Sequence, residues 1–302
     1  MSARPDDSPL LFAPTRQREL NPTAAGLVLG TELRRLRERH GSTVTAAAKA
    51  VNASVSKLSR LERAESPPDL RDVAELATHY QVSSEVRAHL EQLARRTLEP
   101  EWFQPHADFT AAWMHRLIGL ESECARLTTY EMKIVPGLLQ SEGYARRIIS
   151  DGLRVREGSE VEQRLALRQA RQRRFFEQAA PSRATFLLDQ SVLLRRVGTP
   201  QTMREQLGKL LGLVSTPGVT LRFVPLDSSV VSNHGSMTHL VFGPGGPPPM
   251  VYVEGNDDAT YYAKPDDVER HVELMLRLSH EAAASWRDSR AMLLDALDRY
   301  TD

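Results

Sequence analysis

The sequence has a single cysteine, Cys124, in 302 residues. One thiol cannot form an intrachain disulfide and is too few for a zinc cluster, so cysteine usage indicates a reducing compartment. No apolar run approaches the roughly 20 residues that a transmembrane helix needs, and residues 1–28 lack the apolar core of a signal peptide. From these absences we expect a cytoplasmic protein that makes no membrane contact.

The chain also lacks net charge, because 39 Lys and Arg residues balance 39 Asp and Glu residues. A DNA-binding domain needs only one basic face, so this balance does not exclude nucleic acid as a partner. Residues 29–82 carry nine Lys or Arg against seven Asp or Glu, which indicates a local basic stripe. The length and the apolar share of 41% suit two domains with separate cores.

Signatures of catalysis are missing as well. The sequence contains no G-x-S-x-G elbow, no phosphate-binding loop and no paired-histidine metalloprotease motif. The glycines at 243–246 lie in GPGGPPP, where prolines remove the amides that a phosphate would need. We therefore expect neither an enzyme nor a cofactor or metal site.

Residues 43–62, TVTAAAKAVNASVSKLSRLE, predict two short helices joined by a tight turn. The hydroxyl of Thr43 can cap the first helix, and its run of alanines allows a second helix to approach closely. Asn52 stands where the first helix should end, and asparagine tolerates the left-handed conformation that such an end requires. Ser54 can cap the second helix.

The second of these helices predicts a polar outer face. Leu58 and Leu61 are three residues apart and should point inward. The outer side then carries small donors and two cations without a carboxylate, which suits a DNA major groove. The candidate DNA-binding residues are Thr43, Ser54, Val55, Ser56, Lys57, Ser59 and Arg60.

Spacing alone leaves an alternative open, in which the helix pair makes protein contacts in an adaptor or antitoxin-like protein. Residues 29–82, however, resemble the helix-turn-helix of the phage-repressor-like (XRE) regulators, and SKLSRLE matches the second-helix pattern of that family. The resemblance implies a five-helix domain over residues 29–98 that binds double-stranded DNA. Because one such domain reads only a few base pairs, we expect a homodimer.

The preceding helix, expected at 29–40, has an apolar stripe surrounded by arginines. Some of these arginines should reach DNA phosphates, although ordinary solvated surface explains each of them equally well. They are Arg34, Arg35, Arg37 and Arg39.

Composition divides the chain into a flexible tail (1–28), the helix-turn-helix domain (29–98) and a second domain (101–300). Pro100 interrupts the helical pattern near the boundary. In the second domain, helical patterns are followed by short β segments from 219 to 264 and then by helices again. The fold class we expect is mainly α, with an α+β C-terminal domain.

PGLLQSEGYAR (136–146), LLDQSVLLRRVG (187–198) and MVYVE (250–254) are similar to an uncharacterised C-terminal domain carried by actinomycete XRE regulators, including WhiJ-like proteins. That similarity implies a small partner protein. With no catalytic set, we interpret the domain as a module that senses a small-molecule effector or a partner protein. The candidate interdomain or effector residues are Trp102, Phe103, Tyr130 and Tyr144, although Trp102 and Phe103 also fit a simple core role.

Overall fold

The computed structural model describes residues 19–153, 158–177, 183–230, 232, 235–255 and 258–300. The chain forms two compact units. The first contains the described residues up to Gln104 and the segment Phe242–Pro248, and the second contains the rest. No helix in these described ranges is long and apolar enough to cross a bilayer.

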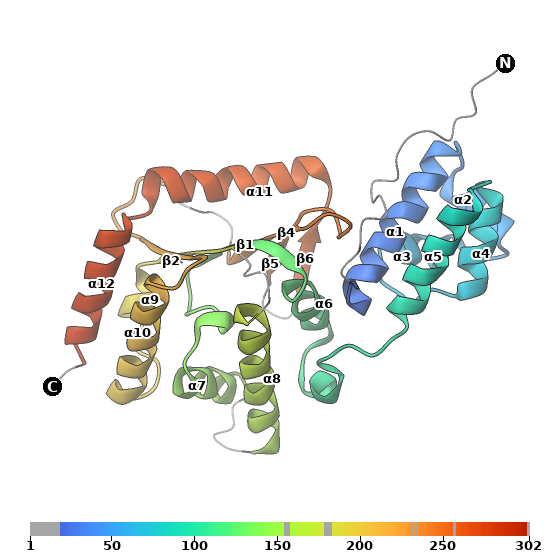
Figure 1. The fold of residues 1–302 in the computed structure, drawn as a ribbon. Helices are drawn as coiled ribbons and strands as arrows, with labels where there is room; N and C mark the ends of the chain where they lie inside the picture. Colours follow the sequence, from blue (N-terminus) through green and yellow to red (C-terminus); the bar gives the residue numbers. More distant parts are fainter. Residues whose placement is uncertain are drawn as a thin grey trace. The chain divides into compact units, whose positions relative to one another are not determined.

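The described part of the first unit folds into the five helices that the sequence predicts (Figure 1). Their bounds are α1 (Pro22–Arg39), α2 (Val44–Ala50), α3 (Val55–Glu62), α4 (Leu70–His79) and α5 (Ser84–Thr97).

The start of α1 corrects our expectation, because the helix begins at Pro22 and not at Leu29. The side chain of Asn21 accepts a hydrogen bond from the Ala24 amide at 2.9 Å, and Pro22 occupies the first turn, where its missing amide has no cost. Part of the predicted tail is therefore helical, while residues 1–18 lie outside the described ranges.

The core of the first unit forms where α1 packs against α3 and α5. Leu29, Leu33, Leu58 and Leu90 are almost completely buried there. The closest approach is at Gly30, where an added Cβ would lie 2.7 Å from the Glu62 carbonyl oxygen and 2.8 Å from that of Leu61. The absence of a side chain at Gly30 thus lets α1 touch the backbone at the end of α3.

The second unit contains a six-stranded sheet of order β3-β2-β1-β4-β5-β6 in its described residues. The strands are β1 (Cys124–Glu131), β2 (Arg183–Asp189), β3 (Val219–Val224), β4 (Met237–Phe242), β5 (Met250–Glu254) and β6 (Ala259–Tyr262). Strands β1, β2 and β3 are parallel, with Leu127 opposite Ala184 and Phe186 opposite Leu221. Strands β4, β5 and β6 pair antiparallel. The α+β class is confirmed, and the parallel half is an addition to what the sequence predicted.

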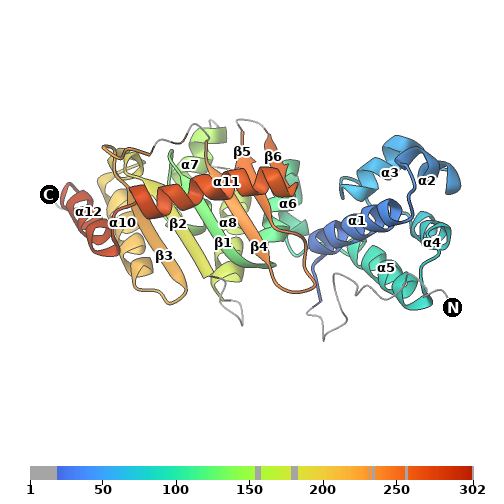
Figure 2. The ribbon, with the colours of Figure 1, turned by 90° about the horizontal axis from the view of Figure 1, so that it is seen from above.

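Parallel neighbours require long crossovers, which helices supply here. Chain segments with α7 (Glu142–Leu153) and α8 (Ser159–Phe176) join β1 to β2, and α9 (Ser191–Leu194) and α10 (Pro200–Val214) join β2 to β3. In Figures 1 and 2, α11 (Pro265–Arg277) crosses one face of the sheet, while α7, α8 and α10 cover the other. The remaining helices are α6 (Ala112–Glu121), α12 (Trp286–Asp298), the 3₁₀ turns η1 (Gln104–Phe109) and η2 (Gly137–Leu139), and the π-turn η3 (Leu278–Ala282).

The α1–α3 contact generates a stability prediction. Gly30→Ala should destabilise the protein by about 1–3 kcal/mol, because the new methyl group must push two backbones apart. Gly208→Ala in α10 is the matched control, since its Cβ would meet nothing within 4 Å and alanine favours a helix by about 1 kcal/mol. Thermal unfolding should show a lower midpoint for the first variant only. Equal midpoints would mean that the contact does not require glycine.

Candidate nucleic-acid interface and pocket

The helix pair α2–α3 has the local geometry that its sequence predicts. The Thr43 hydroxyl accepts a hydrogen bond from the Ala46 amide at 3.1 Å, and the Ser54 hydroxyl accepts one from the Lys57 amide at 3.1 Å. Asn52 adopts a φ of 53°, in the left-handed region. Thr43 therefore fixes where α2 begins, and Asn52 and Ser54 fix where α2 ends and α3 begins.

Helix α3 has one buried and one exposed side. Leu58 and Leu61 are 2% and 6% exposed and join the core, as predicted. Arg60 is exposed, and no carboxylate in the described ranges lies within ion-pairing distance of its guanidinium. The exposed side presents small polar groups and one apolar side chain beside this cation: Ser54, Val55 and Ser56.

Lys57 and Ser59 are tied to neighbouring side chains. The Lys57 ammonium lies 2.6 Å from an Asp72 carboxylate oxygen and 3.7 Å from Asp69. The hydrogen bond to Asp72 raises the pKa of Lys57, and the Ser59 hydroxyl accepts a hydrogen bond from Arg63. A phosphate at Lys57 would therefore have to compete with a carboxylate, whereas Arg60 has no such competitor.

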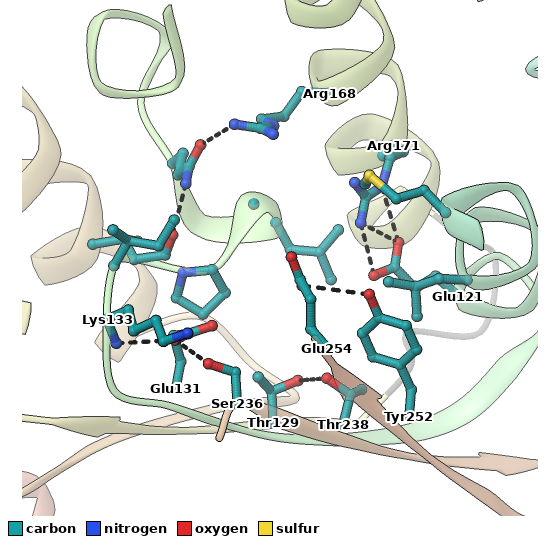
Figure 3. Close-up of a pocket in the computed structure, with 18 of the residues that line it drawn as sticks. Glu121, Thr129, Glu131, Lys133, Arg168, Arg171, Ser236, Thr238, Tyr252 and Glu254 are labelled. Carbon is teal, nitrogen blue, oxygen red and sulfur yellow. Dashed lines mark hydrogen bonds and ion pairs between the residues drawn. The ribbon is translucent and has the colours of Figure 1, made fainter. Parts of the chain in front are cut away.

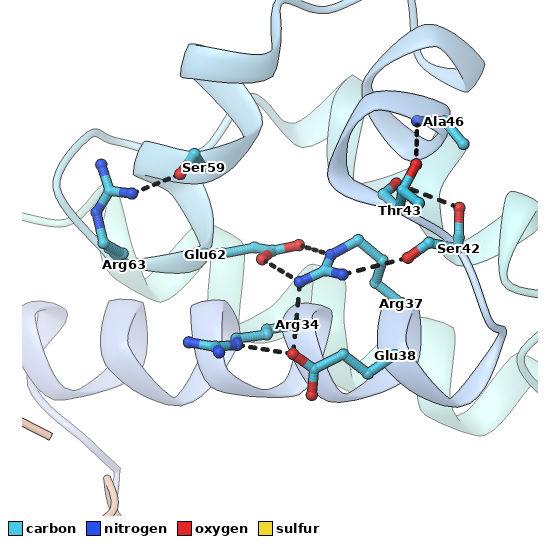
Figure 4. Close-up of polar contacts among 9 residues, drawn as sticks. All are labelled: Arg34, Arg37, Glu38, Ser42, Thr43, Ala46, Ser59, Glu62 and Arg63. Carbon is cyan, nitrogen blue, oxygen red and sulfur yellow. Dashed lines mark hydrogen bonds and ion pairs between the residues drawn. The ribbon is translucent and has the colours of Figure 1, made fainter. Parts of the chain in front are cut away.

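Arg37 is not a surface cation, so neither of the two alternatives left open for it, phosphate contact or solvated surface, describes its environment. It is 8% exposed, and its Nε and Nη2 donate to the Glu62 carboxylate at 2.6 and 3.0 Å. Its Nη1 donates to the Ser42 carbonyl at 3.2 Å (Figure 4). The bond to Glu62 raises the pKa of Arg37. Arg37 therefore links α1, the end of α3 and the segment that enters α2.

The other arginines of α1 are less constrained. Arg34 pairs with Glu38 at 2.9 Å in an exposed i,i+4 pair, and Arg35 pairs with Glu32 at 2.8 Å. Arg39 is exposed at the end of the helix. Local spacing could suggest the first two pairs, but nothing local identifies Glu62 as the partner of Arg37.

Arg37→Met should lower the free energy of unfolding by about 3–5 kcal/mol, because it leaves the Glu62 carboxylate buried without its partner. Arg34→Met, which removes an exposed pair, should change stability by less than about 1 kcal/mol. Adding Glu62→Met to Arg37→Met should restore part of the loss. Equal losses for the two single variants, measured by denaturant unfolding, would contradict the structural role of Arg37.

Trp102 and Phe103 lie at the end of the first unit. Their rings meet edge to face with centroids 5.5 Å apart, and Phe103 is 3% exposed. Burial of this kind is typical of core residues, and an interdomain role for the two stays a prediction.

Tyr130 and Tyr144 belong to the core of the second unit, and an effector-binding role for the two stays a prediction. Tyr130 packs beneath α11 with Leu187 and Met275, and burial raises its pKa to about 12. Tyr144 is fully buried and its hydroxyl accepts a hydrogen bond from the Val135 amide at 3.3 Å. Neither ring lines the main pocket of this unit.

That pocket has a volume of about 350 Å³ and lies between the sheet and the elements α6, α8 and η2 (Figure 3). It borders β1, which has β2 on one side and β4 on the other. The chain adds strands β2 and β3 on the first side and strands β4 to β6 on the second, and open sheets commonly bind ligands at such a switch in direction. Glu121 and Arg171 form a buried ion pair of 2.9 Å in its wall, and burial raises the pKa of Glu121. Sequence analysis missed this site because its polar residues come from distant segments.

Comparisons with known families agree with this division of the chain. A family model described as a helix-turn-helix domain matches residues 28–90. A second, described as a domain of unknown function (DUF5753), matches residues 114–295. No curated protein and no solved structure matches the chain. Because the second match spans more than half of its length, the chain belongs to the DUF5753 family, and it carries a helix-turn-helix domain before the DUF5753 region.

Proposed function

We propose that the protein is a sequence-specific transcriptional regulator of the XRE type that inserts α3 into the DNA major groove. The observation that carries the proposal is the exposed face of α3, where Arg60 lies beside Ser56 and has no carboxylate partner among the described residues. The helix-turn-helix match supports a DNA-binding regulator. A recognition helix needs one side packed in the core and a polar side exposed to the bases of the major groove, and α3 has both.

The exposed groups have distinct capacities on DNA. The fork of Arg60 can donate two hydrogen bonds to a guanine edge, the most common specific contact in the major groove. The hydroxyls of Ser54 and Ser56 can reach bases or phosphates, and the methyl groups of Val55 can contact a thymine methyl. Val55 is 46% exposed, which makes it available for such a contact.

For the second unit we propose sensing, not catalysis. Its pocket is lined by side chains of several elements and is large enough for a small molecule. An effector bound there would act by favouring one state of the regulator over another, which requires different affinities for the two states. The proposal includes a homodimer on a two-fold operator in the cytoplasm.

Arg60→Ala should cost about 1–3 kcal/mol of operator affinity and relax the base preference at one position. Arg95→Ala is the control, because Arg95 is an exposed arginine of α5 and α5 packs on α1 and α4 instead of α3. Selection from a random duplex pool, followed by titration of the selected site, measures both quantities.

The salt dependence of the same titrations separates DNA binding from protein contacts made by the helix pair. Affinity that depends on phosphate contacts must fall steeply as salt rises. Salt-independent binding, or an Arg60→Ala variant with unchanged affinity and preference, would refute the placement of α3 in the groove.

The assembly generates a second prediction. A monomer with an eight-residue reading helix contacts too few base pairs to compete with non-specific sites. Sedimentation of the full chain at micromolar concentration should therefore show a dimer, alone or on operator DNA. Monomers under both conditions would remove the homodimer from the proposal.

A further inference from the structure

The pocket of the second unit contains both balanced and unbalanced charges. Glu121 and Arg171 neutralise each other within its wall. Four other charged side chains line the pocket without an ion-pair partner in the described ranges, namely Glu131, Lys133, Arg168 and Glu254. Charged side chains that are partly removed from water without a partner raise the free energy of the folded protein. A ligand that carries the opposite charges would lower it.

Glu131 is held firmly at the end of β1. One carboxylate oxygen, Oε1, accepts hydrogen bonds from the Met132 amide at 2.9 Å, the Lys133 amide at 3.0 Å and the Ser236 hydroxyl. All three bonds reach the same oxygen, so Oε2 retains its capacity to accept. The contact with Lys133 uses the backbone amide, and the Lys133 side chain is exposed.

Glu254, at the end of β5, is the second carboxylate. Its only hydrogen bond within the described chain comes from the Tyr252 hydroxyl, at a long 3.4 Å. Although Glu254 keeps access to solvent, partial removal from water raises the pKa of its carboxyl, and the negative charge of Glu131 raises it further. A cation bound beside Glu254 would favour the charged form of its carboxyl group.

Arg168 lies on the α8 side of the same pocket, across from the strands (Figure 3). Its Nη1 donates to the Gln140 side-chain oxygen at 2.6 Å. Burial, followed by the charge of Arg171, lowers the pKa of Arg168 to about 10, so the guanidinium remains charged at neutral pH. Its remaining donors match a carboxylate or another anionic group.

We propose that this pocket binds a small amphoteric metabolite, with its ammonium group at Glu131 and Glu254 and its anionic group at Arg168. This inference rests on the proposed sensing role and specifies its ligand class. A volume of about 350 Å³ suits a molecule of amino-acid to dipeptide size. A metal ion is the less suitable occupant, because the described residues contain no group of three or more His, Cys, Asp or Glu side chains placed to hold one.

The test uses ω-amino acids of increasing length, from glycine to 6-aminohexanoate, together with the alkylamine and the alkanoate that match each one. Binding to the full chain is measured by ligand-observed NMR and calorimetry. One chain length should bind best, because the positions of the carboxylates and of Arg168 are fixed. Its matched amine and carboxylate should each bind at least about tenfold more weakly, as loss of a charge-assisted bond implies.

Variants assign the two ends of the ligand. Glu254→Gln should weaken the amino acid and the alkylamine but leave the alkanoate unchanged. Arg168→Gln should weaken the amino acid and the alkanoate but leave the alkylamine unchanged. The controls are Glu269→Gln on α11 and Arg290→Gln on α12, both exposed residues that do not line the pocket, and these should bind as the parent chain does.

Three results would overturn the inference: no binding by any member of the panel, an alkylamine that binds as tightly as its amino acid, or a calcium ion that binds with the same dependence on Glu254. Operator affinity is titrated in parallel with and without the best ligand. A ligand that binds without changing operator affinity supports the pocket inference and removes the sensing role. If the protein binds its operator normally but binds no member of the panel, the ligand inference fails and the proposed DNA-binding function stands.

Discussion

The contact between α1 and the end of α3 is the constraint on which the candidate DNA interface depends. An isolated helix of eight residues has little stability of its own, so the orientation of α3 must come from its surroundings. Gly30 lets α1 approach the backbone of Leu61 and Glu62, and Arg37 holds the carboxylate of Glu62 from the same helix. A helix with no assigned base contact therefore determines where Arg60 points.

The same unit uses most of its nearby charges internally. Arg34, Arg35, Arg37 and Lys57 each have a carboxylate partner, which explains how a domain with only a slight excess of basic residues can still present a defined cationic group. With a zero net charge over the chain, long-range steering toward DNA is weak. In the proposed homodimer, recognition would then depend on a few close contacts made by each subunit.

Local signals in the sequence predicted local structure well. The caps at Thr43 and Ser54, the left-handed Asn52 and the inward leucines follow from interactions within a few residues, and the structure confirms them. Long-range features had no such signal. Parallel pairing of β1 with β2 joins segments separated by two helices, and the pocket unites β1, α8 and β5. In the sequence, Glu131, Arg168 and Glu254 each look like ordinary solvated charges.

In both units, charged side chains with an ion-pair partner stabilise the fold, whereas those without one belong to the candidate binding sites. Arg168 and Arg171 lie three residues apart on α8 and so share a face of that helix. Arg171 is paired with Glu121, whereas the one side-chain partner of Arg168 in the described part of the chain is an amide oxygen. Two glutamates other than Glu121, namely Glu131 and Glu254, line the same pocket, yet neither forms an ion pair with Arg168 in the described structure. Instead Glu131 is fixed by backbone amides and a hydroxyl, which holds it in place as an acceptor. A folded chain that leaves opposite charges in one cavity without joining them retains electrostatic energy that a ligand bearing both charges can release.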